Sequence, residues 1–385
     1  MLRFFTAGES HGPALTAIVE GFPAGVPVTA ETINHDLARR QKGYGRGGRM
    51  KIERDEVQFR SGIRFGESLG APITLVVENL DWKNWTSKMS PRAEDRDPKY
   101  VVSRPRPGHA DLTGALKYDR RDVRDILERA SARETTMRVA VGSLAKCLLR
   151  ELGIEVRGWV SEVGNIKAKH EGLTPDEIFT KAEVSEVRVA DPEAEKAIIA
   201  LVDECKKSGD TLGGVVEIVA TGLPPGLGSH VHYDRKLDGR LAGALLSLQA
   251  AKGVEIGLGF EAARRRGSQV QDEIGYEDGA FNRRTNNAGG TEGGMTSGGP
   301  LVVRVAFKPI STLMKPLASV DLLTKEETKG NIERSDVMAI PAAAVIAEAV
   351  VAFELANVAL EKFGGDSLRE ILRNRDGYLE QVRSA

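Results

Sequence analysis

Three sequence matches that recur in the same order divide the chain into two similar halves. The first aligns Gly8–Gly25 on Gly209–Gly226 without gaps, as GESHGPALTAIVEGFPAG on GDTLGGVVEIVATGLPPG. The second aligns Gly66–Pro72 (GESLGAP) on Gly294–Pro300 (GMTSGGP), and a β-rich run follows in each half. A duplication constrains the architecture more firmly than local propensity does, because both halves must follow one plan.

The third match is a long helix at the end of each half. Helical spacing predicts these helices near Ala132–Leu152 and Pro341–Phe363, with Gly153 and Gly364 as their stops. We therefore expect a single domain over residues 1–385, with halves at about 1–153 and 209–365 and a connector at 154–208. In the connector, Ile154–Ile166 is typical of a strand, and Thr174–Lys207 has helical periodicity.

Composition describes an ordinary globular chain. With 385 residues, 41% of them hydrophobic, it can bury a large core. The net charge of −1 gives no bulk attraction to nucleic acid or to a membrane, so anion binding must come from local clusters. We find no signal peptide before the first motif, and expect a cytoplasmic protein. Cys147 and Cys205 are the only cysteines, which predicts neither a disulfide framework nor a metal site.

The segment Gly8–Gly12 (GESHG) places an acid, Ser10 and His11 between two glycines. Glycine lets the backbone approach a ligand closely, so these side chains can meet a bound molecule. A surface turn with a solvated histidine is the competing interpretation. Because His11 aligns with Leu212 in the second half, the imidazole is no requirement of the repeat, and this asymmetry favours a site.

A basic, glycine-rich segment follows a helix expected at Thr29–Arg40, which Thr29 can cap. Arg39–Lys51 (RRQKGYGRGGRMK) carries six cations with no acid among them. Guanidinium groups bind phosphate or carboxylate in bidentate fashion, so we expect a loop that closes over a small anion. An RNA-contacting tail and a solvated loop are the alternatives.

Ser103–Asp111 (SRPRPGHAD) holds Arg104, Arg106 and His109 on a backbone fixed by prolines. The arginines disfavour the charged form of the histidine, and an anionic ligand would reverse that effect. A histidine bonded to a backbone carbonyl explains the pattern equally well. The preceding polar stretch, Asp81–Tyr100, is interpreted as an excursion or lid.

Ser131 and Glu134 have the spacing of a capping box at the start of the first long helix. Arg129 and Arg133 flank that helix start. Free backbone N–H groups beside arginines favour binding of a phosphate-type anion.

In the second half, an amphipathic helix is expected over Asp238–Lys252, ending at Gln249–Ala250 with Gly253 as its stop. Asn286–Gly299 has six glycines and would let a large flat group lie against backbone, but it lacks the order of a Rossmann or phosphate-loop motif. Lys308–Thr312 (KPIST) and Arg334–Asp336 (RSD) precede the last apolar helix. Asp336 alone is also explained as a helix-start acid.

Together, GESHGPALTAIVEGFPAG, RPGHAD, RASARETTMRVAVG, GGMTSG with KPIST, and RSDVMAIPAAAVIAEA resemble the chorismate synthase family over nearly the full chain. The resemblance implies an α+β fold, a β-α-β sandwich with a helical layer between antiparallel sheets, assembled as a homotetramer. It implies a lyase of the shikimate pathway that converts 5-enolpyruvylshikimate 3-phosphate to chorismate and phosphate. That anti-1,4-elimination needs reduced FMN without net redox change.

The same resemblance implies the site residues. His11 would protonate the departing phosphate, His109 would keep the flavin in its reduced anionic form, and Asp336 would assist deprotonation at C6. The implied FMN contacts are Arg129, Ala130, Ser131, Gln249, Ala250, Gly293, Lys308, Pro309, Ile310, Ser311, Thr312 and Arg334. Implied for NADPH or substrate are Ser10, Arg40, Arg46, Arg49, Arg106 and Arg133.

Two features depart from the family pattern. Where many members have RHDP, this chain has RSDV at Arg334–Val337, so a role for that extra histidine is in doubt. The segment Asp81–Arg104 is also longer than in the shortest members.

Two other classes of function stay open. A flavin reductase would also use FMN and NADPH, and NADPH oxidation without the phosphate substrate would identify it. A nucleic-acid-binding module is disfavoured, because only 5% of residues are aromatic.

Overall fold

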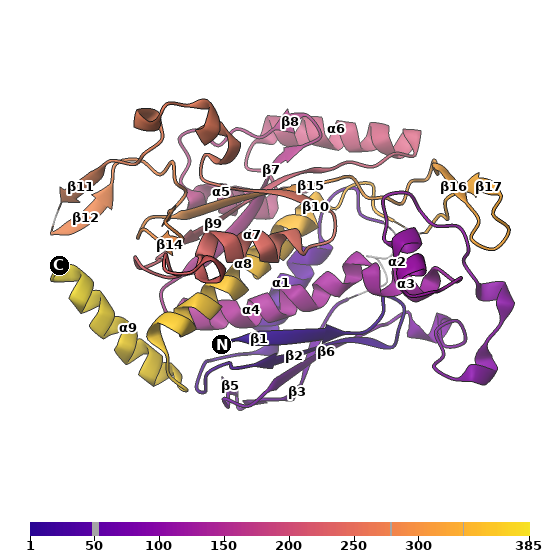
Figure 1. Ribbon diagram of the computed structural model, residues 1–385, viewed down its shortest axis with the longest axis horizontal. Helices are drawn as coiled ribbons and strands as arrows, with labels where there is room; N and C mark the ends of the chain where they lie inside the picture. Colours follow the sequence, from indigo (N-terminus) through magenta and orange to yellow (C-terminus); the bar gives the residue numbers. More distant parts are fainter. Residues whose placement is uncertain (48–53, 278, 334) are drawn as a thin grey trace.

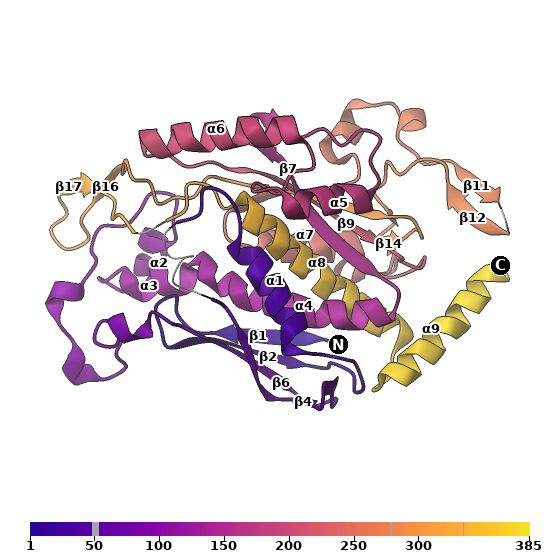
Figure 2. The same ribbon diagram turned by 180° about the vertical axis from the view of Figure 1, so that it is seen from behind.

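The computed structural model describes residues 1–47, 54–277, 279–333 and 335–385. Two antiparallel sheets lie on either side of a layer of helices (Figures 1 and 2). Within the described residues the smaller sheet has the order β1-β2-β6-β3 and the larger one the order β10-β15-β9-β7-β8. The mixed α and β content with antiparallel sheets agrees with the predicted fold class.

The strands of the smaller sheet are β1 (Arg3–Ala7), β2 (Ala14–Glu20), β3 (Val57–Ser61) and β6 (Ile73–Glu78). Those of the larger sheet are β7 (Glu155–Val163), β8 (Ile166–Lys167), β9 (Gly214–Thr221), β10 (Ala251–Ile256) and β15 (Leu301–Phe307). Short hairpins pair β4 (Ile63–Arg64) with β5 (Glu67–Ser68), β11 (Ile274–Glu277) with β12 (Ala280–Arg283), β13 (Thr291–Glu292) with β14 (Met295–Thr296), and β16 (Ala318–Val320) with β17 (Glu327–Lys329).

The helices between the sheets are α1 (Ala30–Gln41), α4 (Thr135–Glu151) and α8 (Ile340–Phe363). The other helices are α2 (Asp111–Lys117), α3 (Arg124–Ala130), α5 (Pro175–Val184), α6 (Pro192–Ser208), α7 (Leu237–Leu246) and α9 (Leu368–Arg383). Helix α4 packs against β2 and β6, whereas α8 packs against β7, β9 and β15.

Residue patterning explains these layers. Strand β15 buries alternate residues, from Leu301 to Phe307, because successive side chains of a strand point to opposite faces. Helix α8 is apolar all round and is long enough by length and composition to cross a membrane. However, 89% of its most apolar window is buried inside the protein, as expected of a core helix.

Several local predictions are confirmed. Thr29 caps α1 by accepting from the Thr32 N–H at 3.3 Å, and both long helices end at the predicted glycines. The predicted strand and helical periodicity at 154–208 correspond to β7, β8, α5 and α6. Strand β7 pairs with β9, so this segment is part of the larger sheet.

Two local predictions are wrong. Helix α7 ends at Leu246, and Gly253 lies inside β10, where the pairing with β15 shifts register between Ala251 and Gly253. The capping box also fails: Ser131 accepts from the Arg133 N–H at 3.3 Å at the start of a 3₁₀ turn, Ala132–Glu134, that leads into α4. The Glu134 carboxylate instead accepts from Thr6 at 2.8 Å and Arg138 at 3.2 Å.

Candidate active site

The loop that carries Ser10 and His11 joins β1 to β2 and packs against the end of α3 and the segment before α4. The Ser10 N–H donates to the Glu128 carbonyl at 3.1 Å, and the Ser131 hydroxyl donates to Ser10 Oγ at 3.2 Å. Gly8 has φ +105°, and a Cβ there would lie 2.4 Å from the Ala14 carbonyl oxygen. Only glycine fits this position, so the glycine shapes the turn that presents His11.

His11 is bound to a buried carboxylate. The His11 N–H donates to Glu128 Oε2 at 2.8 Å, and its Nδ1 lies 3.0 Å from both carboxylate oxygens. Arg124 donates to Glu128 Oε1 at 2.8 Å. Burial alone would raise the pKa of Glu128, but hydrogen bonds and charge from His11, together with Arg124, outweigh it and lower that pKa. The interpretation as a solvated surface histidine is therefore wrong.

The other side of His11 is covered by Trp85, from the polar excursion after β6. The two rings stack with centroids 3.8 Å apart and an interplanar angle of 27°. The Arg124 guanidinium also lies over the Trp85 ring, at 5.3 Å from its centroid. The excursion thus reaches the histidine that the sequence singled out.

Arginines of the basic segment, which contains no acid of its own, have acidic partners elsewhere in the chain. Arg40 is buried and donates to Thr135 Oγ1 at 3.1 Å, the Ala132 carbonyl at 3.2 Å and Asp55 at 3.4 Å. Arg133 meets the other oxygen of Asp55 at 3.1 Å. Arg39 does not reach this site, because it forms ion pairs with Asp36, Glu183 and Glu348.

Asp336 lies against the same segment. Its Oδ2 is 3.1 Å from Arg46 Nε, and its Oδ1 accepts from the Gly47 N–H at 2.6 Å. Arg46 in turn donates to the Arg40 carbonyl at 3.3 Å. Asp336 is thus joined to the basic segment, and it precedes α8 by four residues. Arg49 and Arg334, both predicted site residues, lie outside the described residues.

His109 forms a second histidine–carboxylate pair. Its Nδ1 is 2.5 Å from Oδ1 of Asp111, whose side chain is fully buried, so the partner is a carboxylate and not a backbone carbonyl. Arg106 Nε donates to Asp111 Oδ2 at 2.8 Å, and Arg106 Nη1 donates to Thr312 Oγ1 at 2.8 Å. Burial alone would raise the pKa of Asp111, but hydrogen bonds from His109 and Arg106 hold it well below its usual range.

The Lys308–Thr312 segment packs on this second pair. The Lys308 ammonium donates to the Gly108 carbonyl, and the Lys308 N–H donates to the Ala250 carbonyl at 2.9 Å. The Ile310 carbonyl accepts from Thr211 at 2.7 Å. A Cβ on Gly213 would lie 2.9 Å from the Pro309 nitrogen. A Cβ on Gly108 would lie 3.6 Å from the Ser311 Cβ, so these two segments are in close contact.

The remaining predicted contacts divide between this end and another part of the molecule. Gln249 Nε2 lies 3.4 Å from Glu134 Oε2, and Ala250 has φ +68°, a left-handed conformation that costs a residue with a side chain about 1 kcal/mol. Gly293 sits instead in the β13–β14 turn, whose neighbour Gly294 accepts from the Leu237 N–H at 2.9 Å. No described contact joins Gly293 to the two histidine pairs.

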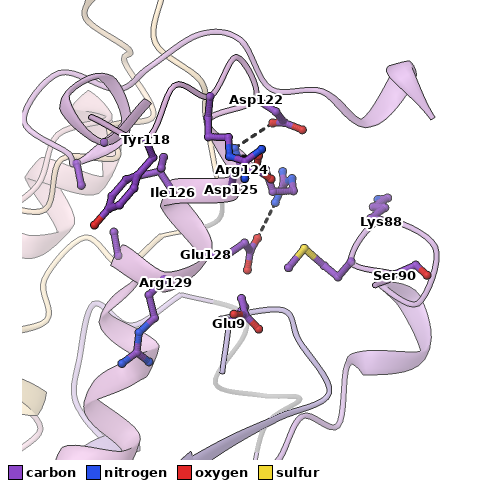
Figure 3. A pocket seen from close by; sticks show the side chains of 15 residues that line it. Glu9, Lys88, Ser90, Tyr118, Asp122, Arg124, Asp125, Ile126, Glu128 and Arg129 are labelled. Carbon is purple, nitrogen blue, oxygen red and sulfur yellow. Dashed lines mark hydrogen bonds and ion pairs between the residues drawn. The ribbon is translucent and has the colours of Figure 1, made fainter. Parts of the chain in front are cut away.

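A cavity of about 890 Å³ lies beside His11's partner (Figure 3). Glu9, Glu128, Arg129 and Ala130 line it together with Lys88 and Met89 of the excursion. The Arg129 guanidinium is tied to Thr6 Oγ1 at 2.6 Å and to the Gly8 carbonyl at 3.2 Å. The cavity therefore adjoins two of the predicted flavin contacts, Arg129 and Ala130.

Sequence reasoning did not assign four of these side chains: Glu128 and Trp85 at His11, Asp111 at His109, and Asp55 between Arg40 and Arg133. Asp111 could have been found, because it closes the RPGHAD motif two residues after His109. Glu128 also stands directly before Arg129. No local signal links either Trp85 or Asp55 to its partners, which lie far away in the sequence.

The arrangement suits proton transfer beside anions. Each histidine has a buried carboxylate against its Nδ1, and such a partner orients the imidazole ring. Arg124 contacts the carboxylate of the first pair and Arg106 that of the second, where Lys308 also lies, and such cations are suited to binding phosphate or carboxylate groups. Among the described residues, no group of three or more His, Cys, Asp or Glu is arranged to hold a metal ion.

Comparisons with known proteins agree on one family. A family model described as chorismate synthase matches residues 2–360. The chorismate synthase of Geobacter sulfurreducens is 62% identical over 392 residues, with 100% of both chains covered, and that of Symbiobacterium thermophilum is 63% identical over 388 residues, with 99% of each covered. A solved structure described as "Crystal Structure of Chorismate Synthase" superposes with a TM-score of 0.81 at 44% identity, covering 100% of this chain and 99% of its own. On these matches the chain belongs to the chorismate synthase family.

Proposed function

We infer that this chain is a carbon–oxygen lyase that converts 5-enolpyruvylshikimate 3-phosphate to chorismate and phosphate. The reaction is an anti-1,4-elimination that requires reduced FMN without net redox change, and it is the last common step of the shikimate pathway. The observation that carries this inference is the family match over residues 2–360, on a chain in which His11 and His109 each contact a buried carboxylate that an arginine also contacts.

We propose that the arginines bind the substrate's anionic groups. The substrate carries a phosphate and two carboxylates, and bidentate guanidinium contacts suit both groups. Arg40 and Arg133 are held on either side of Asp55, while Arg106 is held by Asp111 and Thr312. These buried contacts fix the guanidinium groups before a ligand arrives, which lowers the ordering cost of binding. Arg46, Arg49 and Ser10 belong to the same proposed set.

The residues predicted for FMN fit a flavin. Gln249 Oε1 is buried and has no hydrogen-bond partner among the described residues, so it can accept from a ligand donor. The left-handed backbone at Ala250 is the kind of strain that collects at ligand contacts. Arg129, Ala130, Ser131, the Lys308–Thr312 segment, Gly293 and Arg334 complete the proposed set. When bound, the reduced flavin supplies electron density that helps the phosphate leave C3.

The chain's own groups supply the proton transfers. His11 donates the Nε2 proton to the departing phosphate oxygen. Asp336 assists removal of the proton from C6. His109 and Arg106 offer N–H donors and a fixed positive charge that favour the anionic form of the reduced flavin. Each general acid or base contributes about 10²–10⁴-fold to the rate.

To test these roles, we would measure single-turnover phosphate release with His11→Gln, His109→Gln and Asp336→Asn. Each variant is expected to be slower by about 10²-fold or more, while the dissociation constant of the substrate changes little. His35→Gln is a matched control, because the side chain of His35 is 74% exposed and lies on α1. Wild-type turnover in any one active-site variant would remove that residue from the mechanism.

We propose NADPH as a candidate source of electrons, with Arg40 and Arg46 as its contacts. An NADPH oxidase assay with FMN and without substrate tests whether the chain has flavin reductase activity of its own. Loss of oxidation in Arg46→Ala would support the contact, and unchanged oxidation would contradict it.

We also propose a cytoplasmic homotetramer that uses neither nucleic acid nor membrane as a partner. Ile274, Tyr276 and Phe281 are exposed on the β11–β12 hairpin, which projects from the body at the left of Figure 1. Burial of such side chains between subunits is favourable. Light scattering should give four times the mass of 41.6 kDa, and a monomer would contradict the proposal. Cell fractionation tests the compartment.

Finally, we propose that the halves at about 1–153 and 209–365 are copies of one plan, arranged as a β-α-β sandwich. The Ser68 hydroxyl donates to the Pro23 carbonyl at 2.6 Å and accepts from the Val26 N–H at 2.9 Å. Thr296 repeats both contacts, with Pro224 at 2.6 Å and Leu227 at 2.9 Å.

This repeat predicts matched effects of mutation. Ser68→Ala and Thr296→Val each leave two buried partners unsatisfied, and each should cost about 1–3 kcal/mol. Thermal unfolding of the two single variants and the double variant measures this. If one of the two substitutions left the melting temperature unchanged, the turns that Ser68 and Thr296 hold would not be equivalent.

A further inference from the structure

His11 is held from two sides by residues that lie far from it in the sequence. Glu128 accepts from its backbone N–H and contacts Nδ1, whereas Trp85 covers one face of the ring. A carboxylate only accepts hydrogen bonds, so the proton of this pair resides on the Nδ1 side. The acid role proposed for His11 therefore assigns the transferred proton to Nε2.

Arg124 connects both supports. It donates to Glu128 at 2.8 Å and lies over the Trp85 ring at 5.3 Å from the centroid. Arg124 Nη2 donates to Glu333 Oε1 at 3.2 Å, and the Asn331 side chain donates to the same oxygen at 2.8 Å. Because Glu333 precedes Asp336 by three residues, this chain of contacts links the His11 pair to the segment that carries the proposed base.

Trp85 is itself anchored to the His11 loop. Asn79, at the root of the excursion, donates from its side chain to the Gly12 carbonyl at 2.8 Å and from its backbone to the Pro13 carbonyl at 2.9 Å. The Trp85 indole donates to Asp81 at 3.0 Å. The start of the excursion is therefore built onto the loop it covers, and the stacked ring is not a chance contact of a loose segment.

We propose that Glu128 and Trp85 are positioning residues for His11 in this reaction, a role that rests on the proposed function of His11 as the acid. Glu128 holds the ring so that Nε2 faces the departing phosphate oxygen, and it balances the imidazolium charge. Trp85 fixes the plane of the ring and keeps water from one face. As the C3–O bond breaks, its electron pair goes to the phosphate oxygen, which receives the Nε2 proton and leaves a neutral imidazole still bonded to Glu128.

Pre-steady-state kinetics on the full-length protein with reduced FMN test this. Glu128→Gln and Trp85→Leu should each lower the rate of phosphate release by about 10²-fold, with substrate affinity nearly unchanged, because misplacing a catalytic group acts on the chemical step. Trp85→Phe keeps a stacking ring and should retain most of the rate. Glu193→Gln on α6 is the matched control: it makes the same Glu→Gln change at a side chain that is 82% exposed and has no described contact with His11.

A double-mutant cycle separates positioning from general loosening of the site. If Glu128 and Trp85 act through His11, then adding either substitution to His11→Gln should slow the reaction no further. Independent, multiplying losses would overturn the proposal, as would wild-type rates in both single variants. If Glu128→Gln fails to fold, the Trp85→Leu and Trp85→Phe pair still decides the matter for Trp85, and Glu128→Asp decides it for Glu128.

The same experiment distinguishes two failures. If His11→Gln alone keeps the wild-type rate, the assignment of His11 is wrong and the positioning role falls with it. If His11→Gln is slow while Glu128→Gln and Trp85→Leu are fast, only the positioning role falls.

Discussion

At the scale of residues, the site depends on charges that neutralise one another when buried. Asp111 is fully buried, and the hydrogen bonds from His109 and Arg106 hold its pKa well below the usual range. Because the pKa in the folded state is depressed, this carboxylate stabilises the fold at pH values above its unfolded pKa of about 3.9. That stabilisation is lost as the pH falls through this value toward the folded pKa.

Asp111→Asn should therefore lower stability at neutral pH by about 3–5 kcal/mol, because it leaves Arg106 buried without its countercharge. The difference between variant and wild type should shrink below pH 4, because the unfolded wild type binds a proton at this carboxyl there while the folded protein keeps it charged. Melting temperatures measured across pH 3–7 check both points. A difference that stays constant across this range would show that the charge of Asp111 is not the cause.

Residue type could be read from the sequence, but most partners could not. His11 and His109 stand out because glycines and prolines fix the backbone around them. Glu128 lies 117 positions from His11, and only the packing of the β1–β2 loop on α3 brings them together. The acidic partners of the basic segment could not be predicted for the same reason, since Asp55 meets Arg40 and Asp336 meets Arg46 only after folding.

At the scale of elements, α4 and α8 cross closely at one glycine. A Cβ on Gly142 would lie 2.3 Å from the Ala349 carbonyl oxygen, a backbone atom that cannot turn away. Small residues at such a crossing let two helices approach, and this contact sets the spacing of the layer that carries both sheets. The sequence pattern predicted both helices but not where they cross.

Gly142→Ala should destabilise the protein by about 1–3 kcal/mol through overpacking, although alanine is the better helix former. Gly377→Ala in α9 is the matched control, because no atom outside its own helix backbone and chain neighbours lies within 4 Å of the added carbon. That control should be neutral or more stable by up to about 1 kcal/mol. Thermal unfolding compares the two, and equal shifts would contradict the close crossing.

A glycine marked the end of a helix correctly only where the segment did not pair with a strand. Gly153 and Gly364 end their helices as predicted, each with a positive φ that glycine tolerates. Gly253 looked the same in the sequence but became part of a strand, at an irregularity in the pairing with β15. Glycine at such a bulge is common, so its presence alone cannot tell a helix stop from a strand.

At the scale of the whole molecule, a buried ionic cluster joins the three central helices to the larger sheet. Glu348 of α8 accepts from both Arg39 Nη atoms of α1, at 2.7 and 2.9 Å, and from the Gly158 N–H of β7 at 2.8 Å. Lys146 of α4 also donates to it. Burial alone would raise the pKa of Glu348, but Lys146 and Arg39 outweigh burial and lower it.

Glu348→Gln should cost about 3–5 kcal/mol near pH 7, because it leaves buried cations uncompensated. Its stabilising effect is present above the unfolded pKa of about 4.3 and is lost as the pH falls below it. Glu354→Gln, on the same helix, is the control with opposite sign: burial raises the pKa of Glu354 despite Arg240, so neutralising it should cost little or stabilise. Melting temperatures at pH 7 rank the variants, and a larger loss for Glu354→Gln would refute this account.

The central claim is that the chain performs an elimination that depends on reduced flavin. The most direct test is anaerobic: purified protein, photoreduced FMN and 5-enolpyruvylshikimate 3-phosphate, with phosphate release and chorismate absorbance followed together. We predict that both rise in step and only with reduced flavin. If neither product formed with reduced flavin, the lyase would be contradicted, and NADPH oxidation in a parallel assay with FMN would leave a flavin reductase on the same fold.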